Sequence, residues 1–172
     1  FPGYRNGWRQ REMIDGIEVI RVKTYMTANQ GVVLRTLDFM SFMASAFVQG
    51  LFLKRPDIVV ATSPQFFAAV GGWALADVRR LPFVFELGDL WPRSIVAVGA
   101  LPDSRIIGVL EALELFLYRR SARVVALTET FKEDLVRRGI PAGKIDVILN
   151  GVDLPRYSPR PRDEALAAEL GL

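Results

Sequence analysis

Short apolar runs alternate with helical patterns through most of this 172-residue sequence, and this alternation constrains the fold more than any other feature. The apolar runs lie at 57–62, 82–88, 123–127 and 144–149. Continuous apolar runs are typical of parallel strands buried on both faces, and parallel neighbours are joined by crossover helices. With right-handed crossovers, the pattern predicts an α/β fold that has a parallel sheet with helices on both faces.

Helices are expected between these strands at 65–79, 103–120 and 131–138. The first contains Gly71 and Gly72, and each glycine costs roughly 1 kcal/mol relative to alanine inside a helix. Close packing against a neighbour is the expected reason for their presence. In the third, Thr130 and Glu133 match a capping box that would start the helix.

The amino-terminal third follows a different pattern. Residues 1–16 are rich in Gly, Arg and aromatic side chains and are expected to form a loop, whereas 17–23 alternates apolar and charged residues and predicts an edge strand. From 32 to 53 a helix is expected that is apolar almost all round. Such a helix usually packs on a sheet. The alternative is that part of it contacts the bilayer, with nearby Arg and Lys side chains at anionic headgroups.

Composition excludes several kinds of site. The sequence has no Cys and no His, so it offers no thiolate nucleophile, no Cys-ligated metal and no imidazole base. Its net charge of +3 is spread along the chain, and no predicted helix carries clustered Arg on one face, so a nucleic-acid partner is not expected. No stretch reaches the ~18 apolar residues of a membrane-spanning helix. The absence of Cys and His fits a cytoplasmic protein. Because the chain starts at Phe1, with no initiator Met and no signal-peptide pattern, we expect it to be a fragment of a longer protein.

Three motifs occur in a fixed order. They are Gly88-Asp89-Leu90-Trp91-Pro92 followed by Val98-Gly99-Ala100-Leu101, then Tyr118-Arg119-Arg120-Ser121-Ala122, then Lys144-Ile145 with Asn150-Gly151-Val152-Asp153. In this order the chain resembles the family 4, or group 1, glycosyltransferases, and more narrowly the bacterial enzymes that build lipid-linked surface polysaccharides. The segments Phe1-Pro2-Gly3-Tyr4 and Gly16-Ile17-Glu18-Val19 match the same subgroup.

The resemblance implies a GT-B fold, in which two Rossmann-like domains face each other across a cleft, and a retaining sugar transfer that needs no metal. The chain would then be the amino-terminal half: 1–153 as an acceptor-binding, three-layer Rossmann-like domain incomplete at its start, and 154–172 as the hinge and the start of the nucleotide-sugar domain. A nucleotide sugar is the implied donor, and no cofactor is implied. The acceptor would be a glycan, lipid-linked, with the enzyme cytoplasmic or peripheral on the inner face of the plasma membrane. The chain alone is expected to be inactive.

Two departures follow from the same comparison. Strands that the family places between 17–23 and 57–62 are absent, so we expect 17–23 to stay out of the main sheet: displaced, swapped with a neighbouring copy, or paired with a separate strand. Many relatives carry a His directly before the Asp of the first motif, and here that position is Gly88. A role carried by that His cannot be assigned, and Asp89 is the matching position that remains.

Ligands of open α/β sheets bind at the carboxyl ends of the strands, where Asp89 lies. We expect Asp89 to be catalytic by orienting a sugar hydroxyl, or alternatively to cap the turn before Pro92. Trp91 could stack on a sugar and Arg93 could bind a phosphate of the acceptor. Trp91 could instead pack under the following helix.

Further acceptor-binding candidates follow the other strands. Ser63, Thr128 and Glu129 would lie beside Asp89 at the same sheet edge, although each could only cap the next helix. The cap is the less favoured role for Thr128, because the capping box begins two residues later. Asn150 and Gly151, at the domain junction, could face the donor sugar, with Gly151 at positive φ, or they could form a plain turn.

Glu86 lies within an apolar strand and is expected to be buried. A buried carboxylate needs a partner, for which Arg93, Arg119 and Arg123 are candidates. A structural ion pair is one interpretation and a carboxylate in the cleft is the other. For the whole protein, the alternatives to a glycosyltransferase are a nucleotide-sugar epimerase of the same fold and a non-enzymatic α/β binding module.

Overall fold

The structure is a computed structural model that describes residues 5–26, 31–92, 104–159 and 161–171. Its centre is a four-stranded sheet in the order β3-β4-β5-β6, with every neighbouring pair parallel. The strands are β3 (Val59–Thr62), β4 (Phe83–Leu87), β5 (Arg123–Ala126) and β6 (Ile145–Val147). The four predicted strands and their parallel arrangement are confirmed, and the fold is an α/β fold of Rossmann-like type.

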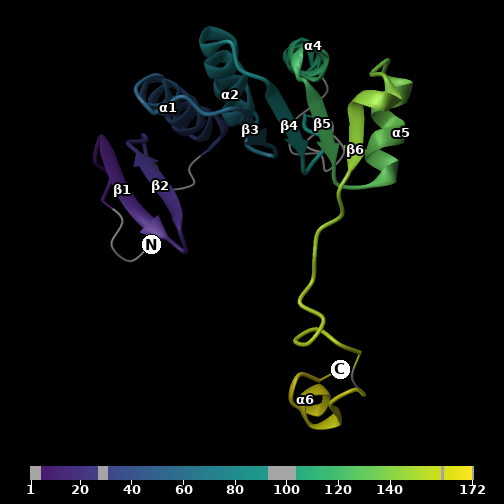
Figure 1. Cartoon of the computed structure of the whole chain (residues 1–172). Helices are drawn as coiled ribbons and strands as arrows, with labels where there is room; N and C mark the ends of the chain where they lie inside the picture. Colours follow the sequence, from purple (N-terminus) through teal and green to yellow (C-terminus); the bar gives the residue numbers. More distant parts are fainter. Residues whose placement is uncertain (1–4, 27–30, 93–103, 160, 172) are drawn as a thin grey trace.

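Helices connect these strands and flank the sheet on one side (Figure 1). They are α2 (Phe66–Arg79), α4 (Arg105–Arg120) and α5 (Glu129–Arg137), followed by a short 3-10 helix, η1 (Ala142–Lys144). Successive right-handed crossovers that advance in one direction along a sheet place their helices on the same face. Helices on both faces need a reversal of strand order, which β3 to β6 do not make. The expectation of helices on both faces is therefore corrected for the described residues.

The hydrophobic core lies between the sheet and these helices. Phe85 and Leu87 of β4 and Val124 of β5 point into it and are almost fully buried, together with Leu117 of α4 and Leu135 of α5. On the opposite face of the sheet, Val60 of β3 and Glu86 of β4 are exposed. Alternation along the strands thus separates a packed face from an open face, and the open face is where the candidate site lies.

A buried charged cluster ties α4 to α5. The Arg138 guanidinium is 2.6 Å from Glu114 Oε2, and the Tyr118 hydroxyl donates to Glu114 Oε1 at 2.7 Å. Burial raises the pKa of Glu114, and the Tyr118 and Arg138 contacts oppose that rise. The Tyr118 ring stacks on Phe85, with the centroids 5.1 Å apart. The motif that begins at Tyr118 is therefore explained by packing and by this cluster.

The amino-terminal strands form a separate hairpin of β1 (Arg9–Ile14) and β2 (Ile17–Val22), which pair antiparallel. The predicted strand at 17–23 is confirmed, and so is its exclusion from the main sheet. The loop expected over 1–16 is wrong for β1. Asp15 and Gly16 both have positive φ and form the two-residue turn of a hairpin, a signal that favours two strands rather than one.

Helix α1 (Gly31–Leu51) packs beside α2 in the helix layer (Figure 1). One of the two glycines of α2 allows this close approach, and the other allows α2 to lie close to the sheet. A Cβ on Gly71 would lie 3.0 Å from Met43 Cγ of α1, and a Cβ on Gly72 would lie 2.8 Å from Ala61 Cβ of β3. Close packing is thus confirmed as the reason for the glycine pair. Among the helices that the structure describes, none is long and apolar enough to cross a membrane.

Substituting Gly72 with Ala is expected to lower the free energy of unfolding by about 1–3 kcal/mol, because Ala61 and the sheet must move to admit the new methyl group. The matched control is Gly108→Ala in α4, where nothing lies within 4 Å of the added Cβ. There the same change should raise stability by roughly 0.5–1 kcal/mol through helix propensity. Urea unfolding of both variants measures the difference, and shifts of the same sign would contradict the packing account.

Beyond β6 the chain extends away from the sheet and ends in α6 (Glu164–Glu169), as Figure 1 shows. Asp163 caps α6 by accepting a hydrogen bond from the Leu166 amide at 3.0 Å. The role of 154–172 as a hinge and the start of a nucleotide-sugar domain stays a prediction.

Candidate functional site

A pocket of about 270 Å³ opens at the carboxyl ends of the strands, where the sequence predicts a ligand. We call it the carboxyl-edge pocket. It is lined by Thr62, Glu86, Leu87, Gly88, Val125, Leu127, Ile148, Leu149, Asn150 and Gly151. These residues come from all four strands of the main sheet or directly follow them, so the parallel register builds the pocket.

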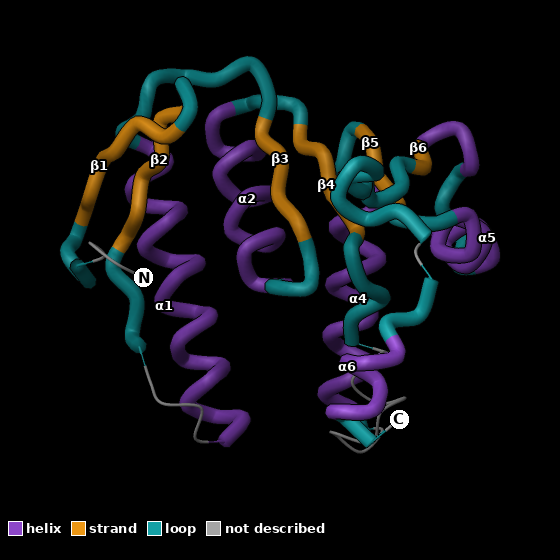
Figure 2. The backbone as a smooth tube through the Cα atoms, turned by 90° about the horizontal axis from the view of Figure 1, so that it is seen from below, coloured by secondary structure: helices purple, strands orange, loops and turns teal. Residues whose placement is uncertain are grey.

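Glu86 supplies the carboxylate of this pocket. It is the register partner of Thr62 on one side and of Val125 on the other, and its side chain is exposed on the open face of the sheet. Figure 2 views the molecule from this side, with the strands in front of α2 and α4. The expected burial of Glu86 is wrong, because no described helix covers this face. Because Glu86 is exposed and not buried, its carboxylate does not need an ion-pair partner.

None of the Arg partners expected for Glu86 pairs with it among the described residues. Arg123 is 3.6 Å from Asp146 and donates to the Gly143 carbonyl. No ion pair joins Glu86 to Arg119 or Arg123 in the part of the chain that the structure describes, and Arg93 lies outside that part. The carboxylate therefore faces the pocket and solvent, where a ligand hydroxyl could donate to it.

Ser63 lies behind the wall of the pocket and holds the turn after β4 in place. Its buried hydroxyl accepts hydrogen bonds from the Gly88 and Asp89 amides, at 3.1 and 3.3 Å. The Ser63 carbonyl lies 2.9 Å from where a Cβ on Gly88 would be, so any side chain at position 88 would push the β3 loop aside. Ser63 thus fixes the turn that carries Asp89, and its hydroxyl does not line the pocket.

The residues of the motif after β4 lie in two different environments, one in the core and one at the edge of the sheet. The Trp91 ring stacks on Phe66 with the centroids 4.6 Å apart, and it packs against the core. Trp91 is therefore packed and does not stack on a sugar-binding face, but its partner Phe66 belongs to the preceding helix α2 and not to the following helix. Asp89 is half-buried beside the pocket and is not among the residues that line it.

Thr128 and Glu129 start α5. The Thr128 hydroxyl accepts a hydrogen bond from the Phe131 amide at 3.2 Å, so Thr128 is the N-cap, and the helix begins at Glu129. The predicted start at 131, with Thr130 as the cap, is corrected. Glu129 is exposed in the first turn, where its charge interacts favourably with the helix dipole.

Asn150 and Gly151 line the carboxyl-edge pocket together with Thr62 and Glu86. The expected positive φ of Gly151 is not found, because the described glycines with positive φ are Gly16, Gly31, Gly139 and Gly171. Sequence reasoning missed Thr62 as a pocket residue. Its position directly before Ser63, at the end of a predicted strand, was the available signal. Within the described ranges, no cluster of three or more acidic side chains could hold a metal ion.

Comparison with known proteins gives matches to a family model and to solved structures. A family model described as a glycosyl transferase 4-like domain matches residues 1–151. Among solved structures, HepE from Anabaena, crystallised in complex with UDP, is similar in fold with a TM-score of 0.52 at 20% sequence identity. The match covers 79% of this chain and 34% of HepE, so this chain spans about a third of the HepE chain. No curated protein matches the sequence.

Proposed function

Because the chain belongs to the glycosyl transferase 4-like domain family, we propose that it forms the acceptor-binding part of a retaining glycosyltransferase of the GT-B type. The observation that carries this proposal is the carboxyl-edge pocket. It lies where ligands of open α/β sheets bind, and it presents polar groups of Thr62, Glu86 and Asn150 between apolar walls. That composition suits a glycan, which offers hydroxyl groups for hydrogen bonds and apolar ring faces for contact.

In this proposal residues 1–153 bind the acceptor, and 154–172 lead to a nucleotide-sugar domain. Glu86 and Asp89 orient the attacking hydroxyl, which brings it into line with the anomeric carbon of the donor. Asn150 and Gly151 lie on the side of the pocket from which the chain leaves the sheet. This position supports a role for the two residues in contacting the donor sugar. Ser63 is a positioning residue for the turn that carries Asp89.

Most of the rate acceleration would come from stabilising the departing diphosphate, and this would be the task of the nucleotide-sugar domain. The 172-residue chain should therefore bind a glycan but transfer no sugar by itself. The UDP bound to HepE supports a nucleotide sugar as the donor. In this proposal the acceptor glycan is carried by a lipid, and the enzyme lies on the cytoplasmic side of the membrane.

Product analysis tests it. The enzyme that contains this domain is supplied with nucleotide sugars and a glycan acceptor, and the anomeric configuration of the new bond is read by NMR. Retention of the donor configuration in an acceptor-linked product is the expected result. An epimerised nucleotide sugar formed without any acceptor would overturn the proposal in favour of an epimerase. The absence of both transfer and epimerisation would leave a binding module as the function.

A further inference from the structure

The carboxyl-edge pocket contains one ionisable side chain, the carboxylate of Glu86, because none of the other residues that line it is ionisable. Glu86 is exposed, and none of the ion pairs between described residues includes it. The described residues of the pocket therefore present a negative charge to a ligand without a cationic side chain beside it.

The charges around the pocket are arranged in the same sense. Glu129 is exposed at the start of α5, directly after β5, and Asp153 is exposed two residues beyond Gly151. Basic residues instead occupy the last turns of the crossover helices: Arg79 of α2, Arg119 and Arg120 of α4, and Arg137 of α5. A helix that connects parallel strands ends at the amino edge of the sheet, so this positive charge lies at the edge opposite the pocket.

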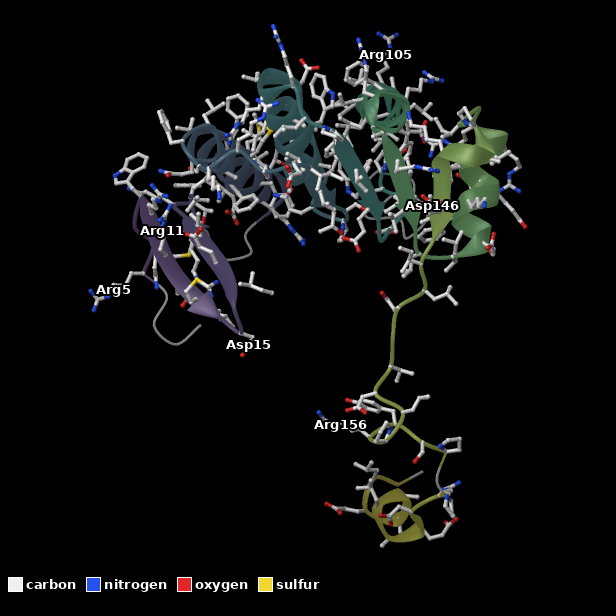
Figure 3. The ribbon with its side chains drawn as sticks, viewed as in Figure 1. Arg5, Arg11, Asp15, Arg105, Asp146 and Arg156 are labelled. Atoms are coloured by element: carbon white, nitrogen blue, oxygen red, sulfur yellow. The ribbon has the colours of Figure 1, made fainter. Side chains whose placement is uncertain are left out.

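Two other sources of positive charge lie nearer to the carboxyl edge. Arg105 at the start of α4 lies on the side of that helix that faces away from the sheet (Figure 3), and Lys132 of α5 does not line the pocket. The amino-terminal ends of α2 and α5 carry partial positive charge, but the side chains of Gln65 and Thr128 cap them. In the described part of this edge, an anionic ligand group therefore gains no cationic partner within the pocket.

The size of the pocket limits what it can hold to about one sugar ring. Its volume of about 270 Å³ lies below the roughly 300–1,000 Å³ of pockets that take drug-sized ligands. A charge on a ring held in so small a space lies close to the Glu86 carboxylate, within one Debye length (~8 Å at physiological ionic strength). Salt therefore screens the interaction between the two charges only in part.

We propose that the carboxyl-edge pocket selects acceptors whose terminal sugar has no acidic group, and that Glu86 is the residue that excludes uronic acids and phosphorylated sugars. The inference rests on the proposed function and adds the chemical class of the acceptor to it. Hydroxyl groups and the ammonium group of an amino sugar can donate hydrogen bonds to the Glu86 carboxylate. A second carboxylate or a phosphate would meet a like charge and would lose hydration without gaining a cationic partner.

Binding of matched glycan pairs to the chain tests this inference. The two members of a pair share their linkages and end in glucose or glucuronic acid, galactose or galacturonic acid, or mannose or mannuronic acid. A glycan array screens the pairs, and calorimetric titration measures the affinities of those that bind. The hexose-ended member should bind at least about tenfold more tightly than its acidic counterpart. In about 1 M salt this ratio should shrink, because the charges are then screened, whereas a steric preference would not change.

Substitutions of Glu86 assign the preference to this residue. Glu86→Gln should bring the ratio of the two affinities close to one, and Glu86→Lys should reverse it, because an ammonium group then replaces the carboxylate. Asp77→Lys is the matched control. It makes the same change in total charge at an exposed position near the carboxy-terminal end of α2, at the opposite edge of the sheet, and should leave the ratio unchanged. Circular dichroism shows whether each variant is folded.

Three outcomes would overturn the inference while leaving the proposed function standing, because each of them includes glycan binding. The first is equal or tighter binding of the acidic members by the wild type. The second is an unchanged preference for the hexose-ended members in folded Glu86→Lys. The third is a change in the ratio as large in Asp77→Lys as in Glu86→Lys. If no member of any pair bound to the chain, the proposed acceptor-binding function would itself be contradicted, and the inference with it.

Discussion

Replacing Arg138 with Met is expected to lower the free energy of unfolding by about 3–5 kcal/mol at neutral pH. The Arg138 and Glu114 side chains are only 10% and 2% exposed, and they lie 2.6 Å apart. Removing the guanidinium leaves the Glu114 carboxylate buried with the Tyr118 hydroxyl as its remaining close partner. It also takes away the cation nearest to Asp134 Oδ2, a buried oxygen that already lacks a hydrogen bond. Urea unfolding measures the loss.

The loss of unfolding free energy in Arg138→Met should depend on pH in a defined direction. The pKa of Glu114 is raised above its ordinary value of 4.5 by burial, and the loss of Arg138 removes a contact that lowers it. A carboxyl group with a raised pKa in the folded state destabilises that state when it is ionised. The penalty of Arg138→Met should therefore be complete above the folded pKa and should shrink as the pH falls through it.

The control is Arg137→Met, one residue earlier. Arg137 also pairs with Asp134, at 3.2 Å, but its side chain is 70% exposed. An exposed ion pair contributes at most about 1 kcal/mol, so this variant should stay close to the wild type at every pH. If Arg138→Met lost no more stability than Arg137→Met, the buried cluster would not hold α4 to α5.

The second large effect is expected at the site. In the enzyme that contains this domain, Glu86→Gln and Asp89→Asn should each lower kcat/KM for transfer by about 100-fold. Both substitutions keep the shape of the side chain and remove the charge that orients the acceptor hydroxyl, and the loss of one such group costs on this order. Initial rates over a range of acceptor concentrations measure the effect.

Asp146→Asn provides a matched control for these variants. Asp146 is an exposed carboxylate of β6 and the register partner of Val125, but it pairs with Arg123 and lies neither in the pocket nor on the turn after β4 that carries Asp89. Its substitution should change kcat/KM by less than about twofold. A rate loss for Asp146→Asn as large as that for Glu86→Gln would mean that general surface charge, and not the pocket, controls the reaction.

Much of the fold follows from local sequence signals. The four main strands were predictable because apolar runs bounded by turn residues are distinctive, and the exclusion of 17–23 from the main sheet followed from the family resemblance. The β1 strand was missed because its charged residues hid the alternation, although Asp15-Gly16 marked the turn. The start of α5 was misplaced because Thr128 and Thr130 are both chemically suitable caps.

The site was harder to predict than the fold. That ligands bind at the carboxyl ends of the strands was clear, but which side chains line the pocket depends on which sheet face is covered. Glu86 was expected to be buried because the strand around it is apolar. The strand order instead leaves its face open among the described residues. Ser63, in contrast, is a polar residue whose hydroxyl turns away from the ligand edge to hold the backbone of the next loop.

The account rests on the claim that the carboxyl-edge pocket binds a glycan, and NMR titration of the isotope-labelled chain tests it directly. The titrant is the oligosaccharide that binds best to the chain on a glycan array. The account predicts amide shifts at Thr62, Gly88, Asn150 and Gly151, and an affinity that falls by about tenfold in Glu86→Gln. Shifts confined to residues away from the strand ends, or equal affinity in Glu86→Gln, would contradict it.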